Sequence, residues 1–322
     1  MRYVLTIATG KKLYLDMAVN LARSFFWWHA DSDIKFIMVT DQEKHIPADI
    51  KPRIQIINIK AGSFGEGFSP KLYLNEVAYE GQTLFIDSDC LIYGDLNRVF
   101  DIFKGHKVAV IGGYIEDGEW FGDIKSICAK FKVPHLPKFN GGVYYLEKSP
   151  IADEVYLKAR ELESNYDDIG FVRLRNRPND EVLMAVAMQL NNQAPIPDHG
   201  DILAEFVNFT SGIKSDLLNG MAELYNNPGN KNYNKTWHLT LSKPVIVHYL
   251  GYHNQIMPYT KEVKQLKYLF EHNYSVNISR CLAFLQVTLP YKILSNLTNM
   301  LRPLYHLLFG VRAVKKSERV ID

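Results

Sequence analysis

Cysteine is scarce in this chain of 322 residues, which has only three, Cys90, Cys128 and Cys281. They are odd in number, lie far apart and form no CxxC pair. This pattern argues against a disulfide scaffold and against a cysteine-based zinc cluster. We therefore expect a protein of a reducing compartment, the cytoplasm.

An excess of charge of one sign and long hydrophobic runs are also missing. Lys and Arg number 37 against 35 Asp and Glu, so the overall charge gives no reason to expect a nucleic acid partner. No uncharged stretch reaches the roughly 20 residues that a membrane-spanning helix needs. The apolar residues 3–8 are too few for the centre of a signal peptide, and Lys11 and Lys12 follow them, so we expect a first strand there.

What the first half does have is an alternation of short apolar runs with segments of helical period, which predicts an α/β sheet with helices on its faces. The expected strands are residues 3–8, 34–40, 54–59, 83–86, 108–112, 142–146 and 244–249. The expected helices are residues 15–28, 69–79, 151–164 and 180–190. Open sheets of this kind place ligands at the carboxyl ends of their strands, so residues that directly follow a strand carry the most functional weight.

The composition changes to helical segments after about residue 257. The sequence therefore predicts a first domain over 1–257 and a helical segment over 258–322. Its stretch 291–309 is apolar but interrupted by polar residues, which is typical of an amphipathic helix on an anionic membrane surface. Basic residues within and after this stretch support that hypothesis: Lys292, Arg302, Arg312, Lys315, Lys316 and Arg319. A helical lid or a contact in a homo-oligomer is the alternative.

Two carboxylates, Asp87 and Asp89, follow the apolar strand 83–86 with Ser88 between them. Strand alternation would put both side chains on one face. A bound divalent cation is a natural way to stabilise two carboxylates that face the same way. A plain turn or helix cap is the alternative, although the apolar flanks indicate that the two side chains are nearly enclosed.

Five short segments match, in order, those of glycosyltransferase family 8, the family of glycogenin and the lipooligosaccharide galactosyltransferases. They are residues 6–14, 69–72, 139–146, 179–183 and 245–251. The sequence therefore resembles this family over about residues 1–254. The resemblance implies an α/β protein with the GT-A fold, which has a mixed central sheet with flanking helices, followed here by a C-terminal helical tail.

The resemblance also implies a metal site and a donor site. The metal, Mn²⁺ or Mg²⁺, would be held by Asp87, Asp89 and His248. The residues implied for the donor, a UDP-sugar, are Ala8, Thr9, Tyr14, Lys71, Asp87, Ser88, Gly251 and His253. Asn140 and Asp180 would lie at the transferred sugar.

Two positions differ from the family pattern. Glu181 stands where the family has glutamine, and Asn254 stands where it has a lysine that faces the diphosphate. Another cation would have to replace that lysine, and His253 is one candidate.

The implied activity is metal-dependent, retaining transfer of a hexose from a UDP-sugar to a glycan or a lipid-linked acceptor, at the cytoplasmic face of a membrane. Two alternatives stay open. A haloacid dehalogenase-like phosphatase also carries Asp-x-Asp after an apolar strand, but usually on its first strand and with Thr or Val where this chain has Leu91. The other is a non-catalytic relative that binds glycans.

Overall fold

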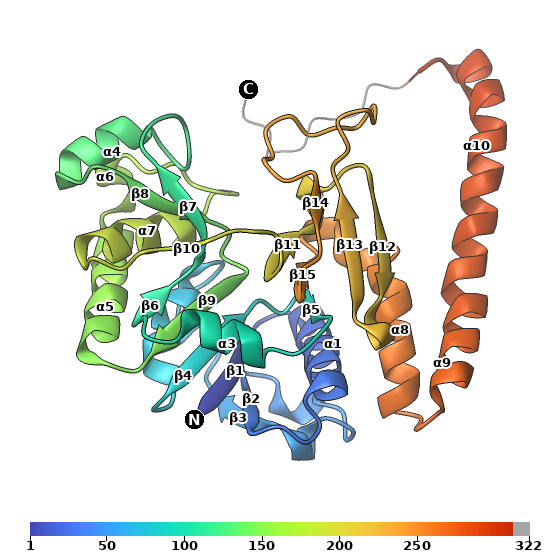
Figure 1. Ribbon diagram of the computed structural model, residues 1–322, viewed down its shortest axis with the longest axis horizontal. Helices are drawn as coiled ribbons and strands as arrows, with labels where there is room; N and C mark the ends of the chain where they lie inside the picture. Colours follow the sequence, from blue (N-terminus) through green and yellow to red (C-terminus); the bar gives the residue numbers. More distant parts are fainter. Residues whose placement is uncertain (312–322) are drawn as a thin grey trace. The chain divides into compact units, whose positions relative to one another are not determined.

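The computed structural model describes residues 1–311, and they divide into two compact units, Met1–Asn254 and a second that begins at Gln255 (Figure 1). The strands of the first unit are β1 (Arg2–Ala8), β2 (Ile34–Thr40), β3 (Gln55–Asn58), β4 (Gln82–Ile86), β5 (Cys90–Ile92), β6 (Val108–Ala109), β7 (Ile111–Ile115), β8 (Leu136–Phe139), β9 (Val143–Glu147), β10 (Ile196–Pro197), β11 (Leu203–Glu205), β12 (Gly212–Asp216), β13 (Met221–Tyr225), β14 (Leu241–Ser242) and β15 (Ile246–His248).

The helices of the first unit are α1 (Lys12–Trp28), α2 (Leu74–Val77), α3 (Asn97–Phe103), α4 (Ile124–Phe131), α5 (Pro150–Ser164), α6 (Tyr166–Ile169) and α7 (Asp180–Leu190). Short 3₁₀ helices are η1 (Glu43–His45), η2 (Lys51–Arg53), η3 (Ser69–Tyr73), η4 (Phe206–Asn208) and η5 (Leu217–Asn219), and η6 (Gly251–Gln255) follows β15. Side-chain caps define where α5 and α7 begin, and these two helices pack together. The Ser149 hydroxyl caps α5, and the Asn179 side chain caps α7.

The largest sheet among the described residues has the order β3-β2-β1-β4-β9-β6. β3, β2, β1 and β4 are parallel, whereas β9 runs antiparallel to β4 and β6 antiparallel to β9. Residues of β1 and β4 such as Leu5 and Phe85 are buried in the main apolar core, together with apolar residues of α5 and α7. The carboxyl ends of the parallel strands therefore meet at one edge, with a rigid core beneath them.

Three smaller sheets surround this edge in the described part of the chain, in the orders β10-β7-β8, β11-β15-β5 and β12-β13-β14. The expected strand 108–112 is wrong as a single element, because Val110 separates β6, in the large sheet, from β7, which pairs with β8 and β10. The expected helix 69–79 is also wrong. A 3₁₀ segment, η3, comes first, and α2 ends at Val77 before an extended Ala78.

The second unit is helical, with α8 (Tyr259–Phe270), α9 (Val276–Ala283), the π-helical turn η7 (Phe284–Thr288) and α10 (Leu289–Phe309). The Tyr268 hydroxyl on α8 donates to Gln286 Oε1 at 2.6 Å. Within residues 1–311, no helix combines the length and apolarity required to cross a bilayer. The basic residues Arg312, Lys315, Lys316 and Arg319 lie outside the described residues.

We expect Leu5→Ala to lower the free energy of unfolding by about 2–5 kcal/mol, because it leaves a cavity under the central strands. Urea unfolding followed by circular dichroism measures this loss. Leu157→Ala on α5 is the control, since Leu157 is 53% exposed and should cost little. Equal losses for the two variants would contradict the proposed position of the core.

Candidate active site

The Asp87-Ser88-Asp89 segment is a tight turn and does not continue the strand. β4 ends at Ile86, and the Cys90 amide donates to the Asp87 carbonyl oxygen at 3.0 Å, which closes the turn. Strand alternation is therefore the wrong reason for the proximity of the two carboxylates. The turn sends the chain into β5, whose antiparallel pairing with β15 aligns Cys90 with His248. This pairing places the imidazole of His248 next to the two aspartates, although they are more than 150 positions apart in the sequence.

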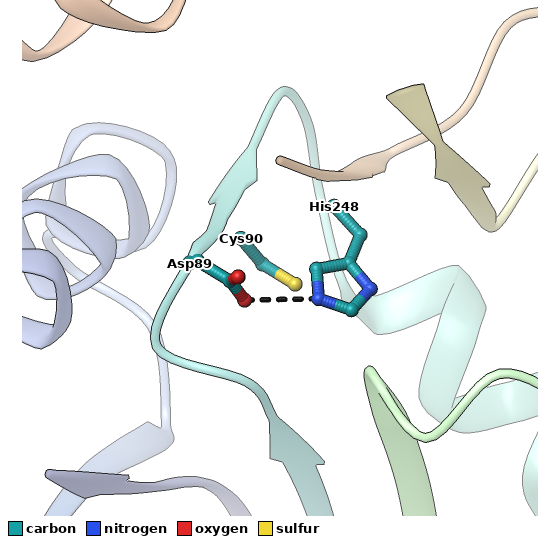
Figure 2. A group of neighbouring side chains, drawn as sticks. All are labelled: Asp89, Cys90 and His248. Carbon is teal, nitrogen blue, oxygen red and sulfur yellow. Dashed lines mark ion pairs between the residues drawn. The ribbon is translucent and has the colours of Figure 1, made fainter. Parts of the chain in front are cut away.

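The predicted metal ligands converge at this turn. Asp89 Oδ1 lies 2.9 Å from His248 Nε2, and Asp87 Oδ2 lies 4.0 Å from the same nitrogen. Figure 2 shows a neighbour that sequence reasoning missed, the buried thiol of Cys90, whose sulfur belongs to one potential ligand group with Asp89 and His248. The sequence signal for this neighbour was that Cys90 directly follows Asp89.

Asn140 fixes the orientation of the His248 ring. Its Oδ1 lies 2.8 Å from His248 Nδ1 and also accepts from the Gly142 amide at 2.9 Å. An amide oxygen can only accept, so His248 Nδ1 carries a proton and Nε2 is the nitrogen directed at the aspartates. Gly142 leaves the necessary space, because a Cβ there would lie 2.5 Å from His248 Nδ1.

The charges of this cluster depend on one another. Burial is the largest single influence on the pKa of His248 and lowers it, but the charge and hydrogen bond of Asp89, together with the charges of Asp87 and Glu205, outweigh burial and raise this pKa. Burial is also the largest influence on the pKa of Asp89 and raises it, but the charge and hydrogen bond of His248, together with the charge of Lys71, outweigh burial and lower this pKa. In the absence of another cation, an imidazolium and a carboxylate therefore face each other in a buried place.

The donor set fits a divalent cation. Among residues 1–311, Asp89 Oδ1 and His248 Nε2 are buried atoms without a hydrogen bond of good geometry, although they are close together. Carboxylate oxygens and a ring nitrogen held from its other side by a hydrogen bond are typical ligands of Mn²⁺. The atoms that would hold the ion are Asp89 Oδ1, His248 Nε2 and an oxygen of Asp87.

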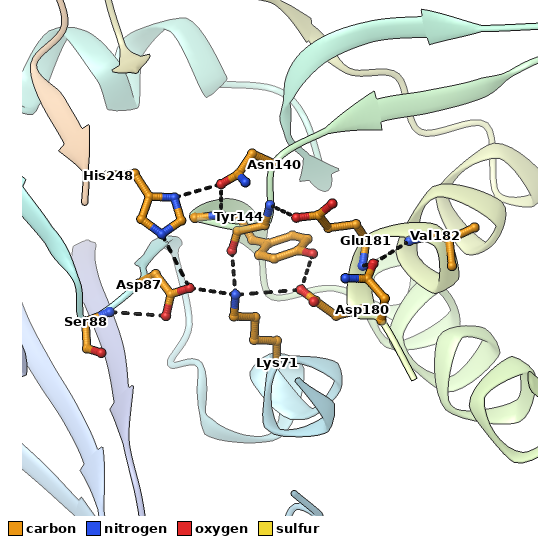
Figure 3. A network of polar contacts seen from close by, with 12 residues as sticks. Lys71, Asp87, Ser88, Asn140, Tyr144, Asp180, Glu181, Val182 and His248 are labelled. Atoms are coloured by element: carbon orange, nitrogen blue, oxygen red, sulfur yellow. Dashed lines mark hydrogen bonds and ion pairs between the residues drawn. The ribbon is translucent and has the colours of Figure 1, made fainter. Parts of the chain in front are cut away.

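Lys71 connects this cluster to helix α7 (Figure 3). Its ammonium donates to Asp87 Oδ2 at 2.7 Å and to the Gly141 carbonyl oxygen at 2.8 Å, and it lies 3.8 Å from Asp180 Oδ2. Burial lowers the pKa of Lys71, but the charges of Asp180 and Asp87 outweigh it and hold the pKa above its ordinary value. Lys71 is therefore a mostly buried cation between two acids.

Asp180 and Glu181 approach from the first turn of α7. Asn179 supplies the helix cap, so both acids are available for other contacts. Asp180 Oδ2 accepts from the Tyr144 hydroxyl at 2.6 Å, and Glu181 Oε1 accepts from the Gly141 amide at 2.8 Å. Burial and the charge of Asp180 raise the pKa of Glu181 to about 8, so much of it is a neutral acid at pH 7. A protonated glutamic acid has the shape and one donor of the glutamine that it replaces.

The remaining predicted residues come from the end of β1, the loop after it, α1 and η6. Ala8 is buried at the end of β1, Thr9 follows it, and Tyr14 on α1 is 40% exposed. Gly251 has a φ of 61°, which suits glycine at the start of η6. The His253 ring packs against Phe206 and Tyr252, with ring centroids 4.7 Å and 4.1 Å away.

Asp41 is a second residue that sequence reasoning missed. It directly follows β2, and its carboxylate accepts from the Gly10 amide, which holds the loop after β1. The signal was the same as for Asp87, an acid at the carboxyl end of a parallel strand.

We expect Lys71→Met to lower the free energy of unfolding by about 3 kcal/mol, because it leaves two acids in contact without their cation. Lys125→Met, at a side chain that is 74% exposed, is the matched control and should cost almost nothing. In an Asp180→Asn background the cost of Lys71→Met should shrink. Equal costs for the two lysine variants in chemical unfolding would show that the bridge adds no stability.

No protein-family model and no curated protein sequence matches this chain. Solved structures do match. The galactosyltransferase LgtC, crystallised in complex with donor and acceptor sugar analogs, is 14% identical, and the match covers 77% of this chain and 87% of that chain with a TM-score of 0.51.

The bifunctional glycosyltransferase WbbM in its apo form is 10% identical, with 84% of this chain and 51% of that chain covered and a TM-score of 0.51. This chain thus spans about half the length of WbbM. These matches show a shared fold. At identities this low they say nothing about the reaction, which must be inferred from the residues of the site. The chain has the GT-A fold of these glycosyltransferases, as its sequence predicted.

Proposed function

We propose that this protein is a metal-dependent, retaining glycosyltransferase that moves a hexose from a UDP-sugar to a glycan or a lipid-linked acceptor. The observation that supports the proposal best is the meeting of Asp89 Oδ1 and His248 Nε2, 2.9 Å apart and buried, beside Asp87 at the end of a central strand. The fold supports it as well, since LgtC was crystallised with donor and acceptor sugar analogs.

The metal would neutralise the negative charge that develops on the leaving diphosphate. The protein's own part is to hold the charges in place. Asn140 fixes the ring of His248 through Nδ1, and Lys71 holds the Asp87 carboxylate beside it through a hydrogen bond. Asp180, held by the Tyr144 hydroxyl, is the acid that we assign to the transferred sugar. In the retaining reaction the acceptor hydroxyl attacks on the side of the leaving group, so no nucleophilic side chain is needed.

For the donor nucleotide we propose the end of β1 and the loop after it. Ala8 and Thr9 would hold the base through their backbone, and Tyr14 would stack on it. Lys71, Asp87, Ser88, Gly251 and His253 would face the diphosphate and its sugar. Asn254 supplies no cation there, and Lys71, in contact with Asp87, is the lysine that we assign to this task.

The structure does not favour the phosphatase alternative. Asp87 follows β4, the fourth strand of the chain, whereas those enzymes usually carry their motif on the first.

We expect Asp89→Asn to reduce release of UDP from a UDP-sugar by roughly 100-fold or more, because the amide is a much weaker ligand for the metal. Turnover is measured with Mn²⁺ and with EDTA across UDP- and GDP-sugars, and Mn²⁺ binding is measured by calorimetry. Asp168→Asn, at an exposed acid, is the control. Full turnover by Asp89→Asn, or turnover of wild type in EDTA, would refute the metal assignment. Release of phosphate from simple phosphate monoesters would favour a phosphatase. The absence of turnover with every donor and every monoester would favour a binding protein.

We further propose that the second unit binds the inner face of an anionic membrane through α10. Leucines and other apolar residues recur along it at helical spacing, at 293, 294, 297, 300, 301, 304, 307 and 308. None of its residues is buried. Residues 276–311 contain Arg280, Lys292 and Arg302 and no acid. An exposed apolar stripe flanked by cations only is complementary to a surface of anionic lipids.

The paired substitution Leu297→Glu and Leu301→Glu should reduce binding to vesicles with anionic lipids at least about tenfold, because it replaces two apolar side chains of the stripe with charged ones. The control is the pair Asn296→Glu and Asn299→Glu, which adds the same charge to the polar face. This control should reduce vesicle binding less than the leucine pair does. Vesicle flotation of the full chain measures both. Equal losses would assign the effect to charge alone, and a full-length wild type that does not float would exclude the membrane.

A further inference from the structure

A cavity of about 210 Å³ lies in the first unit directly beside the polar network. Asn140 and Glu181, which belong to that network, also line the cavity. The other lining residues that matter here are Trp120, Lys138, Phe139, Asp198, Glu205 and Trp237. The volume is below the ~300–1,000 Å³ of sites for drug-sized ligands, which indicates room for one sugar ring and not for a long segment of glycan.

The topology explains why polar groups gather here. Lys138 and Phe139 end β8, Asp198 follows β10, and Glu205 ends β11. The register of β11 with β15 pairs Glu205 with His248, so the floor of the cavity continues into the candidate metal site. The cavity is thus built from strand ends, the positions at which α/β sheets bind their ligands.

Trp237 comes from the loop between β13 and β14. The buried Asn226 holds this loop, since its side chain donates to the Asn234 carbonyl oxygen at 2.9 Å and accepts from the Asn234 amide at 2.8 Å. Among residues 1–311, Trp237 Nε1 is a buried donor without a hydrogen-bond partner. A buried donor of this kind is costly unless a ligand supplies an acceptor. An indole offers a sugar both a flat apolar face and one donor, and Trp120 provides a second such face.

Acids dominate the charge of the cavity. Asp198, Glu205 and the largely neutral Glu181 line it against one amine, that of Lys138. The charge of Glu205 is already felt within the cavity, since it raises the pKa of Glu181 together with burial and the charge of Asp180. Carboxyl oxygens accept hydrogen bonds from hydroxyl groups, whereas another anion in the same space would be repelled.

We propose that this cavity is the acceptor site and that it selects an uncharged sugar ring, with uronic acids and phosphorylated sugars excluded by Asp198 and Glu205. The role of acceptor site rests on the proposed function, whereas the binding of an uncharged sugar does not.

The test is direct binding to the full chain, followed through the indole N–H signals in NMR. The chain has four tryptophans, and Trp237→Phe identifies the signal of Trp237 by its loss. The probes are methyl β-glucoside and methyl β-galactoside, each compared with its matched methyl uronoside. Trp27, whose indole donates to the Leu218 carbonyl oxygen, and Trp28 serve as internal controls on α1.

We expect at least one uncharged probe to shift the signals of Trp120 and Trp237 and to leave Trp27 and Trp28 unchanged. Its uronoside should bind at least about tenfold more weakly, because two carboxylates repel it. The paired variant Asp198→Asn and Glu205→Gln should narrow this difference to about threefold or less, with an unchanged circular dichroism spectrum. A uronoside that binds as tightly as its uncharged partner, or shifts confined to Trp27 and Trp28, would overturn the inference.

Failure of this inference and failure of the proposed function give different results. Mn²⁺-dependent donor hydrolysis without a shift by either uncharged probe would refute the sugar cavity alone. Shifts at Trp120 and Trp237 without hydrolysis of any donor would refute the transferase and leave the cavity as a sugar-binding site.

Discussion

The site depends on how its buried negative charge is balanced. Asp87, Asp89, Asp180 and Glu181 lie close together in a site that is largely shielded from water, with Asp180 almost completely buried. Lys71 balances one side of the cluster, where it contacts Asp87 and approaches Asp180. On the other side, His248 offsets the negative charge of Asp89, either as a protonated imidazolium or, as proposed, by binding a metal together with Asp89. Lys71 and His248 therefore offset the negative charge of the acids from two sides of the cluster.

Backbone packing serves this balance. Gly141 and Gly142 have no side chain, so Asp180 and His248 approach the backbone to distances that a Cβ would prevent. The turn at Asp87 is held by the Gly142 carbonyl oxygen, which accepts from the Asp87 amide at 2.8 Å. The turn at Asp87 and the backbone at Gly142 are therefore joined directly. Charged groups that are held in place in this way need little reorganisation during a reaction.

The alternating pattern of the first half predicted the α/β fold well, because strands and helices such as β1, β2, α5 and α7 have strong local signals. Prediction failed where tertiary contacts decide the structure. The turn at Asp87 depends on a strand pairing with residue 248, and the division of β6 from β7 depends on two different sheets. Lys71 was recognised, but its contact with Asp87 could not be foreseen, because no local pattern joins residues 16 positions apart in a 3₁₀ helix and a turn. Trp237 and Glu205 carry no motif at all, and only the fold brings them together.

The pairing of β5 with β15 also sets an order of assembly. The aspartates at 87 and 89 leave the ribosome long before His248, and β15 lies between β5 and β11 in its sheet. Until that strand is inserted, the acids have only Lys71 as a cation within reach. Contacts between residues so distant in sequence carry a high cost in chain entropy, which slows folding. The imidazole that completes the proposed metal site therefore reaches the aspartates only through the pairing of β15 with β5, and a chain that ends before β15 has the two acids without it.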